Sequence, residues 1–402
     1  MTPAAPTAFD REQALDRLAT GQFDVLVVGG GITGAGVALD AASRGLRTAL
    51  VERDDFGSGT SSRSSKLVHG GLRYLRQGDY RLVAQALAER RRLLHNAPHL
   101  VRPLPFLVPS YGSRAGLRAV SSALWLYDLA GGFRIGLHRR LSPADTLARA
   151  PALRSQGLTG AHLYLDAQAD DARLTLAVAR TAVLDHGAVA ANHARVTALE
   201  PGGAQVEADG HTLEIDASIV VSAAGVWADE LAGAARPSIR PAKGVHVTVP
   251  AERIPTDVAL VLPVRADGRT VFVVPWPGTG RVYIGTTDTD YDGPLDSPVC
   301  TGADVDYLLD AVNASLTTAL EPADVVGTWA GLRPLVAEGA HGRRSSDLSR
   351  RHRVSRTPEG LVTISGGKLT TYRAMASDTV DEVESALGGR RVPCRTATLA
   401  LR

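Results

Sequence analysis

The stretch FDVLVVGGGITGAG, residues 23–36, decides the fold. It begins with an apolar run of the length of a buried strand and breaks at three consecutive glycines. Small and apolar residues then recur at helical spacing over 33–43, and LRTALVE (46–52) predicts a second buried strand that ends at Glu52. Strand, glycine turn, helix and strand together form a βαβ unit. We therefore expect an α/β fold that opens with a dinucleotide-binding unit.

The glycines of this unit have the spacing Gly29-x-Gly31-x-x-Gly34. Such glycines make the tight turn, let the backbone approach a pyrophosphate and pack the helix against the strand, while the helix N-terminus supplies N–H donors. Glu52 ends the second strand, where a carboxylate accepts the ribose hydroxyls of an adenosine and would repel a 2′-phosphate. The pattern predicts FAD or NAD.

Composition narrows the class of protein. The 402 residues suggest two domains, and 44 Lys and Arg against 42 Asp and Glu give a net charge of +2. Without an overall basic field we expect no nucleic-acid partner, so any anion site is local. Cys300 and Cys394 lack metal-ligand spacing, which predicts a cytoplasmic protein without a metal centre. The N-terminal residues show no basic stretch followed by an apolar core, and no run of ~18 apolar residues occurs, so we expect neither a leader peptide nor a spanning helix.

Periodicity along the chain predicts a discontinuous arrangement of two domains. We assign 20–75, 155–238 and 345–390 to an FAD-binding domain, and 76–154 and 239–344 to a substrate-binding domain. The second domain is expected to contain a mainly antiparallel sheet, because several strand-like runs between residues 239 and 290 alternate with Pro and Gly turns.

Residues 76–150 are expected to be mainly helical. LVAQALAERRRLL (82–94) and the stretch near Trp125 have helical patterns, and the proline-rich segment 98–109 is expected to connect them. The runs Arg90–Arg92 and Arg390–Arg391 are interpreted as solvated surface.

Two later glycine junctions favour FAD over NAD. IVVSAAG (219–225) predicts a strand whose final residue, Gly225, lets the backbone pass close to a dinucleotide. ISGGKLTTYR (364–373) predicts a closing strand followed by a helix that opens at Gly366-Gly367 and Lys368. N–H donors there can face the flavin pyrimidine carbonyl, where negative charge accumulates on reduction.

The segment GSGTSSRSSKLVHGGLRYL (57–75) carries the densest group of polar side chains. Its hydroxyls and backbone N–H groups can bind phosphate or ribityl oxygens, and its glycines and apolar residues fix the charged ones. From this segment we assign to cofactor binding Thr60, Ser61, Ser65, Lys66 and His69.

Together the motifs resemble those of the FAD-dependent (aerobic-type) glycerol-3-phosphate dehydrogenases. In chain order they are GGGITGAG (29–36), SSRSSKLVHGGLRYL (61–75), DAQADDARL (166–174), AAGVWAD (223–229), KGVH (243–246), IGTTD (284–288), GLRPL (331–335), SRRHRV (349–354) and SGGKLTTYR (365–373). The combination of HGGLRYL with GGKLTTYR is specific to this family among glutathione-reductase-like flavoproteins. The resemblance implies a Rossmann-like FAD-binding domain of the glutathione-reductase/D-amino-acid-oxidase type, with an inserted α+β substrate domain.

The resemblance also implies a reaction and its partners. The cofactor would be FAD bound without covalent attachment, and the reaction would oxidise sn-glycerol 3-phosphate to dihydroxyacetone phosphate. The electrons would pass to a quinone, and the enzyme would contact the inner face of the membrane peripherally. A homodimer is left open. Members of the family usually continue past the region of Cys394 into a C-terminal helical domain, whereas this chain ends at Arg402. We therefore expect that domain to be absent.

A phosphate ester requires forked guanidinium donors. Arg73, Arg333 and Arg350 each lie within a motif, with Tyr74 beside the first. Lys368 adds a fourth cation next to the glycines expected to face the flavin. These residues predict a phosphate site in an otherwise nearly neutral protein.

Oxidation transfers a hydride from substrate C2 to flavin N5, and a base must accept the hydroxyl proton. His246, Lys368 and His69 are the candidates, because neighbouring charge and desolvation can adjust their pKa values. Arg333 is placed with His246 and Lys368 in the catalytic group, and Asp288 is expected to organise a turn or orient a basic partner rather than act as the base.

Two other functions remain open. An amine-oxidising flavoprotein of the D-amino-acid or sarcosine oxidase type shares the two-domain plan but needs to recognise a carboxylate and an amine. A non-catalytic, truncated FAD-binding protein is the second alternative. The cations within the motifs favour a phosphate ester.

Overall fold

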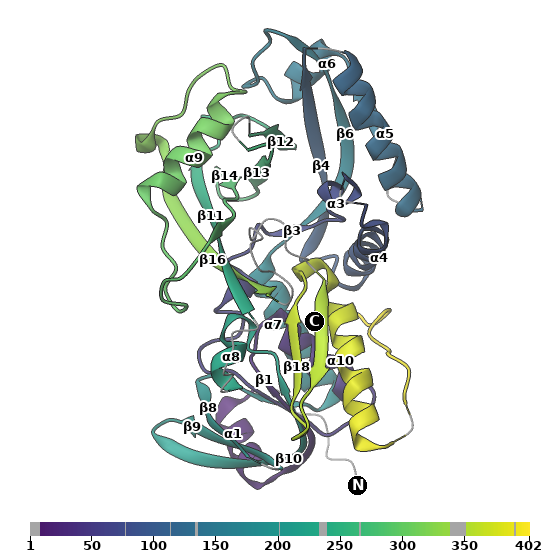
Figure 1. Cartoon of the computed structure of the whole chain (residues 1–402), viewed down its shortest axis with the longest axis vertical. Helices are drawn as coiled ribbons and strands as arrows, with labels where there is room; N and C mark the ends of the chain where they lie inside the picture. The colour runs from purple at the N-terminus through teal and green to yellow at the C-terminus, as the bar shows by residue number, and fades with distance from the viewer. Residues whose placement is uncertain are drawn as a thin grey trace.

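Two β-sheets organise the chain, an eight-stranded sheet in the lower half of Figure 1 and a ten-stranded sheet in the upper half. The computed structural model describes residues 9–76, 78–112, 114–132, 136–200, 202–232, 239–264, 267–337, 351–389 and 391–402.

The first sheet has the strand order β17-β18-β10-β1-β2-β7. β1 lies between β10 and β2, and both neighbours run parallel to it. β8 and β9 extend the sheet as an antiparallel meander on β10. The strands are β1 (Gln22–Val28), β2 (Thr48–Val51), β7 (Val189–Ala191), β8 (Ala194–Glu200), β9 (Gly203–Ala208), β10 (His211–Ser222), β17 (His352–Arg356) and β18 (Val362–Gly366).

Both faces of this sheet are covered, as its continuous apolar strands require. Val25 and Val27 of β1 pack with α2 (Ile32–Ser43), α7 (Asp171–His186) and α10 (Tyr372–Leu387). The alternate residues Leu26 and Val28 pack on the other face with α1 (Arg11–Thr20) and the meander. The predicted βαβ unit is therefore present and buried, with its glycine turn at the carboxyl edge of the strands.

The second sheet has the order β15-β11-β14-β13-β12-β4-β6-β3, with β16 on β11 and β5 on β6. It is mainly antiparallel, as expected. Its strands are β3 (Leu67–Val68), β4 (Val101–Tyr111), β5 (Arg139–Leu141), β6 (Leu158–Ala169), β11 (Ile239–Pro250), β12 (Ala259–Pro263), β13 (Thr270–Trp276), β14 (Arg281–Gly285), β15 (Thr289–Asp290) and β16 (Gly327–Val336).

Helices surround the second sheet, with α4 and α5 on the right of Figure 1 and α9 on the left. The remaining helices are α3 (Leu72–Arg76), α4 (Tyr80–Asn96), α5 (Arg114–Ala130), α6 (Pro143–Arg149), α8 (Ala228–Leu231) and α9 (Gly302–Asn313). Short 3₁₀ turns are η1 (Thr60–Ser62), η2 (Gly225–Trp227), η3 (Pro322–Asp324) and η5 (Leu369–Thr371).

Strand β4 differs from the sequence expectation, which treated 98–109 as a connection. Pro103, Pro105 and Pro109 lie within this strand, which pairs with β6 along its length. All three occupy odd-numbered positions, so the missing N–H groups fall along one edge and the other edge keeps its donors.

Strand β6 was not foreseen either. Its range and that of β3 fall in segments assigned to the FAD-binding domain, yet both strands belong to the second sheet. The strand buries Asp166 and Gln168 among its apolar residues, so it lacks the alternation by which a half-buried strand is recognised.

Candidate functional site

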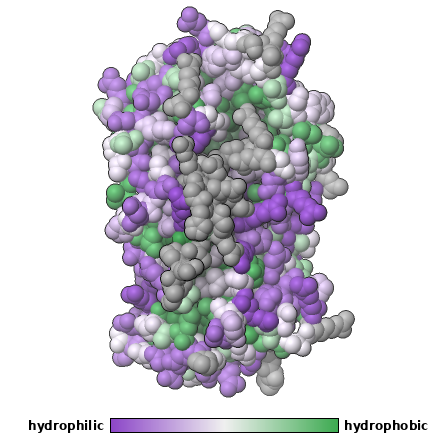
Figure 2. Space-filling view, in the orientation of Figure 1, coloured by the Kyte–Doolittle hydropathy of each residue, from purple (hydrophilic) through white to green (hydrophobic). Residues whose placement is uncertain are grey.

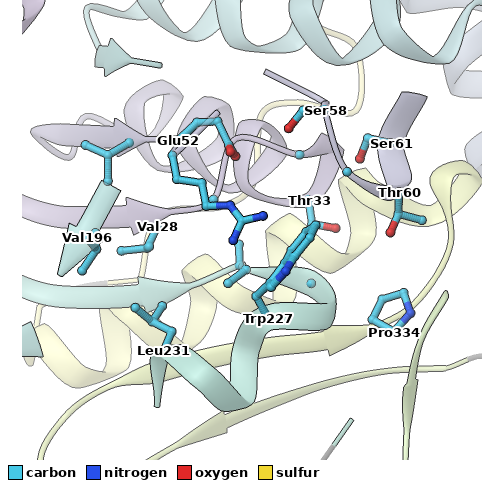
Figure 3. Close-up of a pocket in the computed structure, with 18 of the residues that line it drawn as sticks. Val28, Thr33, Glu52, Ser58, Thr60, Ser61, Val196, Trp227, Leu231 and Pro334 are labelled. Atoms are coloured by element: carbon cyan, nitrogen blue, oxygen red, sulfur yellow. The ribbon is translucent and has the colours of Figure 1, made fainter. Parts of the chain in front are cut away.

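A cavity of about 470 Å³ opens at the carboxyl edge of the parallel strands. Figure 3 shows the hydroxyls of Thr60 and Ser61 at one side and the apolar side chains of Val28 and Val196 at the other. The predicted residues that line the cavity are Gly29, Gly31, Glu52, Thr60, Ser61, Gly225, Gly366, Gly367 and Lys368. Most of the predicted cofactor residues are thus brought together around one hollow.

The first glycine turn is built for close contact of main chain with main chain. Gly29 has φ +109°, and a Cβ on Gly34 would lie 1.8 Å from the Gly29 carbonyl oxygen. Gly34 is the predicted cofactor glycine that does not line the cavity, because it packs α2 against β1. Ser61 Oγ accepts the N–H of Ile32 at 2.9 Å, which ties η1 to the first turn of α2. The N-terminus of α2 consequently faces the cavity through main-chain atoms.

Glu52 lies at the end of β2 and reaches back to the glycine turn. Its carboxylate accepts the N–H of Gly30 at 2.6 Å and the N–H of Asp54 at 2.9 Å. Burial raises the pKa of Glu52, and these two hydrogen bonds oppose that rise. Each carboxylate oxygen retains a lone pair for a hydroxyl donor, as the expected contact with a ribose requires.

The opposite end of the cavity is also built from glycine. Gly366 and Gly367 have φ of +75° and +81°, and a Cβ on Gly367 would lie 2.3 Å from Met375 Sδ. Gly225 has φ +58°, but a Cβ there would meet no protein atom within 4 Å, because that position faces open space in the cavity. A glycine cradle at three junctions fits an extended dinucleotide, so the residues present fit FAD.

A second cluster forms where β11 and β16 pair. The register sets Ala242 opposite Arg333 and His246 opposite Trp329, so KGVH and GLRPL lie side by side. A Cβ on Gly244 would lie 2.5 Å from Arg333 Nη2, so this glycine gives the guanidinium room to lie against the strand.

The segment IGTTD holds Arg333 from the other side. Arg333 Nη1 pairs with Asp288 Oδ1 at 3.2 Å, and Nη2 donates to Thr286 Oγ1 at 3.1 Å and to the carbonyl of Thr287 at 3.2 Å. Asp288 thus orients a basic side chain, as predicted. This arrangement fixes the guanidinium against β11; Pro334, the next residue of β16, lines the cavity, whereas Arg333 and His246 do not.

His246 is buried in an aromatic setting. Its ring stacks on Trp329 at 4.7 Å between centroids, and Nε2 lies 2.8 Å from Ser65 Oγ. Nδ1 has no partner among the described residues. Burial, together with the charges of Arg333 and Lys66, lowers the pKa of His246 to about 3, so the imidazole is neutral near pH 7.

Lys66 lies above the same aromatic group. Its Nζ pairs with Asp171 at 2.6 Å and lies 5.7 Å from the centre of the Trp329 ring. Asp171 belongs to DAQADDARL and has a fully buried side chain. Ser65 and Lys66 therefore contact the second cluster, whereas the sequence assigned them to the cofactor; neither lines the cavity.

Lys368 joins the cavity to the segment HGGLRYL through Tyr74. Lys368 lines the cavity, and its Nζ lies 3.6 Å from the centre of the Tyr74 ring. The N–H of His69 donates to Thr370 Oγ1 at 3.2 Å, which joins HGGLRYL to GGKLTTYR. His69 itself does not line the cavity.

Two predicted phosphate ligands stay predictions. The backbone of Arg73 belongs to α3, but its side chain lies outside the described part of the structure, and Arg350 lies outside the described residues altogether. Arg90, interpreted as solvated surface, is instead 4% exposed and pairs with Asp166. That interpretation was wrong because the helix turns Arg90 toward a buried carboxylate, which a run of three arginines does not reveal; Arg91 is exposed as predicted.

Sequence reasoning missed several side chains of the site. Trp329 stacks on His246, Asp171 pairs with Lys66, and Trp227 lines the cavity beneath Arg53, whose guanidinium carbon lies 4.3 Å from the ring centre. Both Asp171 and Trp227 stand in quoted motifs, so the motifs were a signal for them. Trp329 could not be found in this way, since only strand register brings it to His246.

Among the described residues, no group of three or more His, Cys, Asp or Glu side chains is placed to hold a metal ion. No helix in the described ranges is long and apolar enough to cross a bilayer.

Comparison with known proteins identifies a family and relatives that agree with each other. The family model described as FAD dependent oxidoreductase matches residues 24–377. Glycerol-3-phosphate dehydrogenase 2 of Mycobacterium tuberculosis is 45% identical over 404 residues, which cover 97% of this chain and 68% of that protein. Aerobic glycerol-3-phosphate dehydrogenase of Staphylococcus aureus is 40% identical over 416 residues, covering 99% of this chain and 74% of that protein.

Solved structures agree with these relatives. The glycerol-3-phosphate dehydrogenase of Bacillus halodurans, complexed with FAD, superposes with a TM-score of 0.78 at 37% identity and covers 97% of this chain and 70% of that chain. Glycine oxidase of Geobacillus kaustophilus has a TM-score of 0.68 at 22% identity, covering 95% of this chain and 99% of that one. The second likeness shows the fold alone.

Proposed function

Because the chain belongs to the FAD-dependent oxidoreductases and, among them, to the glycerol-3-phosphate dehydrogenases, we propose that it oxidises sn-glycerol 3-phosphate to dihydroxyacetone phosphate with a quinone as electron acceptor. FAD is its cofactor. The observation that carries the proposal is the fixed guanidinium of Arg333, held by Asp288 and Thr286 beside neutral His246.

In this proposal the first sheet and its helices hold the cofactor, and the second sheet, including β3 and β6, holds the substrate. Glu52 accepts the ribose hydroxyls, and the N-terminus of α2 with Thr60 and Ser61 receives the pyrophosphate. Gly366, Gly367 and the amide groups that follow them face the flavin. When bound, FAD accepts the hydride that leaves substrate C2.

The phosphate is proposed to bind Arg333, with Arg73, Tyr74 and Arg350 completing the site. A guanidinium forms paired, charge-assisted hydrogen bonds with phosphate oxygens, and Asp288 keeps its plane fixed. Lys368, stacked on Tyr74 at the cavity, is proposed to hold the substrate oxygen at the flavin end.

His246 is proposed as the base. As the C2–H bond breaks, the hydroxyl proton passes to the imidazole and the carbonyl forms. Arg333 and Lys66 both lower the pKa of His246. A phosphate dianion on Arg333 counters their charges and raises that pKa, so substrate binding itself prepares His246 to accept a proton.

Anaerobic bleaching of the bound flavin tests this function against its alternatives. Glycerol 3-phosphate should bleach the wild-type protein, while glycine and sarcosine should leave it yellow. Bleaching by an amine substrate alone would assign the chain to the amine oxidases. A flavin that no substrate reduces would identify a non-catalytic FAD protein. Repeating the reaction with a ubiquinone analogue and with oxygen identifies the acceptor.

Peripheral contact with an anionic membrane is a further part of the proposal, supported by helix α5. Four large apolar side chains near its C-terminal end are between 47% and 61% exposed. They are Trp125, Leu126, Leu129 and Leu137. Figure 2 shows apolar residues on the right-hand edge, at the height where Figure 1 draws the lower end of α5. Arg118, Arg139 and Arg140 are exposed nearby, whereas Asp128 is buried against His138.

Vesicle sedimentation tests the membrane contact. The protein should bind vesicles that contain phosphatidylserine, less so at high salt, and Leu126→Ser with Leu129→Ser should weaken binding without changing flavin reduction. Equal binding by the double variant would contradict the assignment of this surface. Concentration-dependent dimerisation that the same substitutions abolish, without vesicle binding, would make the surface a subunit contact.

A further inference from the structure

Three polar side chains are buried behind the segment 69–74. Arg90 on α4, Tyr127 on α5 and Asp166 on β6 are 4%, 2% and 2% exposed. Polar groups in a core are costly unless they are hydrogen-bonded, so the bonds of these three residues account for their presence.

The three side chains form one chain of hydrogen bonds. Arg90 pairs with Asp166 and donates to the carbonyl of Leu165 at 2.8 Å. The Tyr127 hydroxyl donates to Asp166 Oδ2 at 2.8 Å and accepts the N–H of Gly70 at 2.9 Å. The chain therefore ends on the main chain of HGGLRYL, the segment that carries His69, Arg73 and Tyr74.

Gly70 is closely packed at this contact. A Cβ on Gly70 would lie 2.6 Å from the Tyr127 hydroxyl and 2.5 Å from Leu87 Cδ2. On its other side, the N–H of His69 donates to Thr370 Oγ1. The turn at residues 69–70 is thus held between the second sheet and the closing glycine junction of the first.

We propose that Arg90, Asp166 and Tyr127 form a positioning network that sets where HGGLRYL presents its side chains to the substrate. The inference rests on the proposed function for its kinetic consequence. None of the three is assigned to contact substrate or cofactor; they act through the backbone of Gly70. Asp166 lies on β6 and bonds to side chains of α4 and α5 and to the N–H of Gly70, so it links the second sheet and its helices to the turn.

Tyr127→Phe is the variant that separates position from packing. It keeps the ring, which lies edge-on to Tyr164 at 5.7 Å, and removes the hydroxyl that accepts the Gly70 N–H. Tyr164→Phe is the matched control, because Tyr164 lies in the same apolar cluster and is buried to a similar degree. Both variants lose one buried tyrosine hydroxyl.

Two measurements are expected to distinguish the variants. In Tyr127→Phe, kcat/KM for glycerol 3-phosphate should fall about tenfold, since the buried Gly70 N–H loses its shorter acceptor, keeps only Asp166 Oδ1 at 3.4 Å, and the turn shifts. Hydrogen exchange in a peptide covering 68–74 should become faster, while FAD content stays at the wild-type value. Tyr164→Phe should match the wild type in both measurements.

Each other outcome overturns a stated claim. Wild-type kinetics and exchange in Tyr127→Phe, equal effects in both variants, or faster exchange spread over both sheets would make Tyr127 a residue of general stability and end the inference. Absence of flavin reduction by glycerol 3-phosphate in the wild type would instead overturn the proposed function. Local exchange at 68–74 would then still decide whether the network holds the turn.

Discussion

The cofactor cavity and the cluster around His246 and Arg333 are built in opposite ways. The cavity is organised by main chain at three β–α junctions, where glycines lie, and the carboxylate of Glu52 binds the N–H of the first of these turns. The cluster is made of side chains from β11, β14–β15 and β16 and from the loop before β3. A site built from main chain depends on local turns, whereas one built from side chains depends on strand register.

The two regions should also respond differently to substitution. A Cβ added at a close main-chain contact has nowhere to go, so the turn must open. A side chain removed from the cluster leaves the strands paired and changes the charge that a substrate meets. Substitutions should therefore cost folding and FAD in the first region and substrate selectivity in the second.

The largest effect is expected from Gly34→Ala. Its Cβ would lie 1.8 Å from the Gly29 carbonyl oxygen, so α2 must move off β1. We expect a loss of about 3 kcal/mol or more in the free energy of unfolding, together with the bound flavin. Denaturation followed by circular dichroism and the flavin absorbance give both values.

Gly116→Ala makes the same change in another helix and gives the smallest expected effect. Gly116 is an exposed residue of α5, and no atom lies within 4 Å of the added Cβ. This variant should therefore gain roughly 0.5–1 kcal/mol in the free energy of unfolding. Equal stability of the two variants would refute the close packing at Gly34.

Glu52→Ala should weaken FAD binding next most strongly. The carboxylate accepts two backbone N–H groups and is proposed to accept ribose hydroxyls, and losing bonds to a charged acceptor costs about 2 kcal/mol, roughly thirtyfold in Kd. Titration of the apoprotein with FAD measures this change. An unchanged Kd would remove Glu52 from the cofactor site.

The cofactor cavity could be predicted from the sequence better than the cluster around His246 and Arg333, because local turns form the cavity and strand register forms the cluster. FDVLVVGGGITGAG specifies strand, turn and helix within one short stretch, and the structure contains all three. In contrast, the pairing of His246 with Trp329 depends on the register of two strands far apart in the chain. Arg90 and β6 were misread because a buried ion pair and a strand with internal Asp and Gln leave no amphipathic pattern.

His246 should make the free energy of unfolding depend on pH. Burial lowers its pKa from 6.5 to about 3. The unfolded chain then binds a proton that the folded protein excludes, so the free energy of unfolding falls as the pH falls from about 6.5 toward 3, by up to ~1.4 kcal/mol per unit.

His246→Asn removes this titration while keeping a polar group beside Ser65. Its stability should decline less steeply than that of the wild type over the same range, in urea titrations without substrate. Parallel curves would show that His246 is not held neutral by the fold.

Arg333→Ala, assayed by anaerobic flavin reduction with glycerol 3-phosphate and with glycerol, tests most directly the claim that side chains of the second sheet recognise a phosphate ester. Losing one charge-assisted contact costs about 2 kcal/mol, so kcat/KM for glycerol 3-phosphate should fall roughly thirtyfold, whereas the low activity on glycerol should change far less. Arg91→Ala, at an exposed arginine of α4, should match the wild type on both substrates. Equal losses on the two substrates in Arg333→Ala, with FAD retained, would contradict the account and make Arg333 part of the hydride-transfer step.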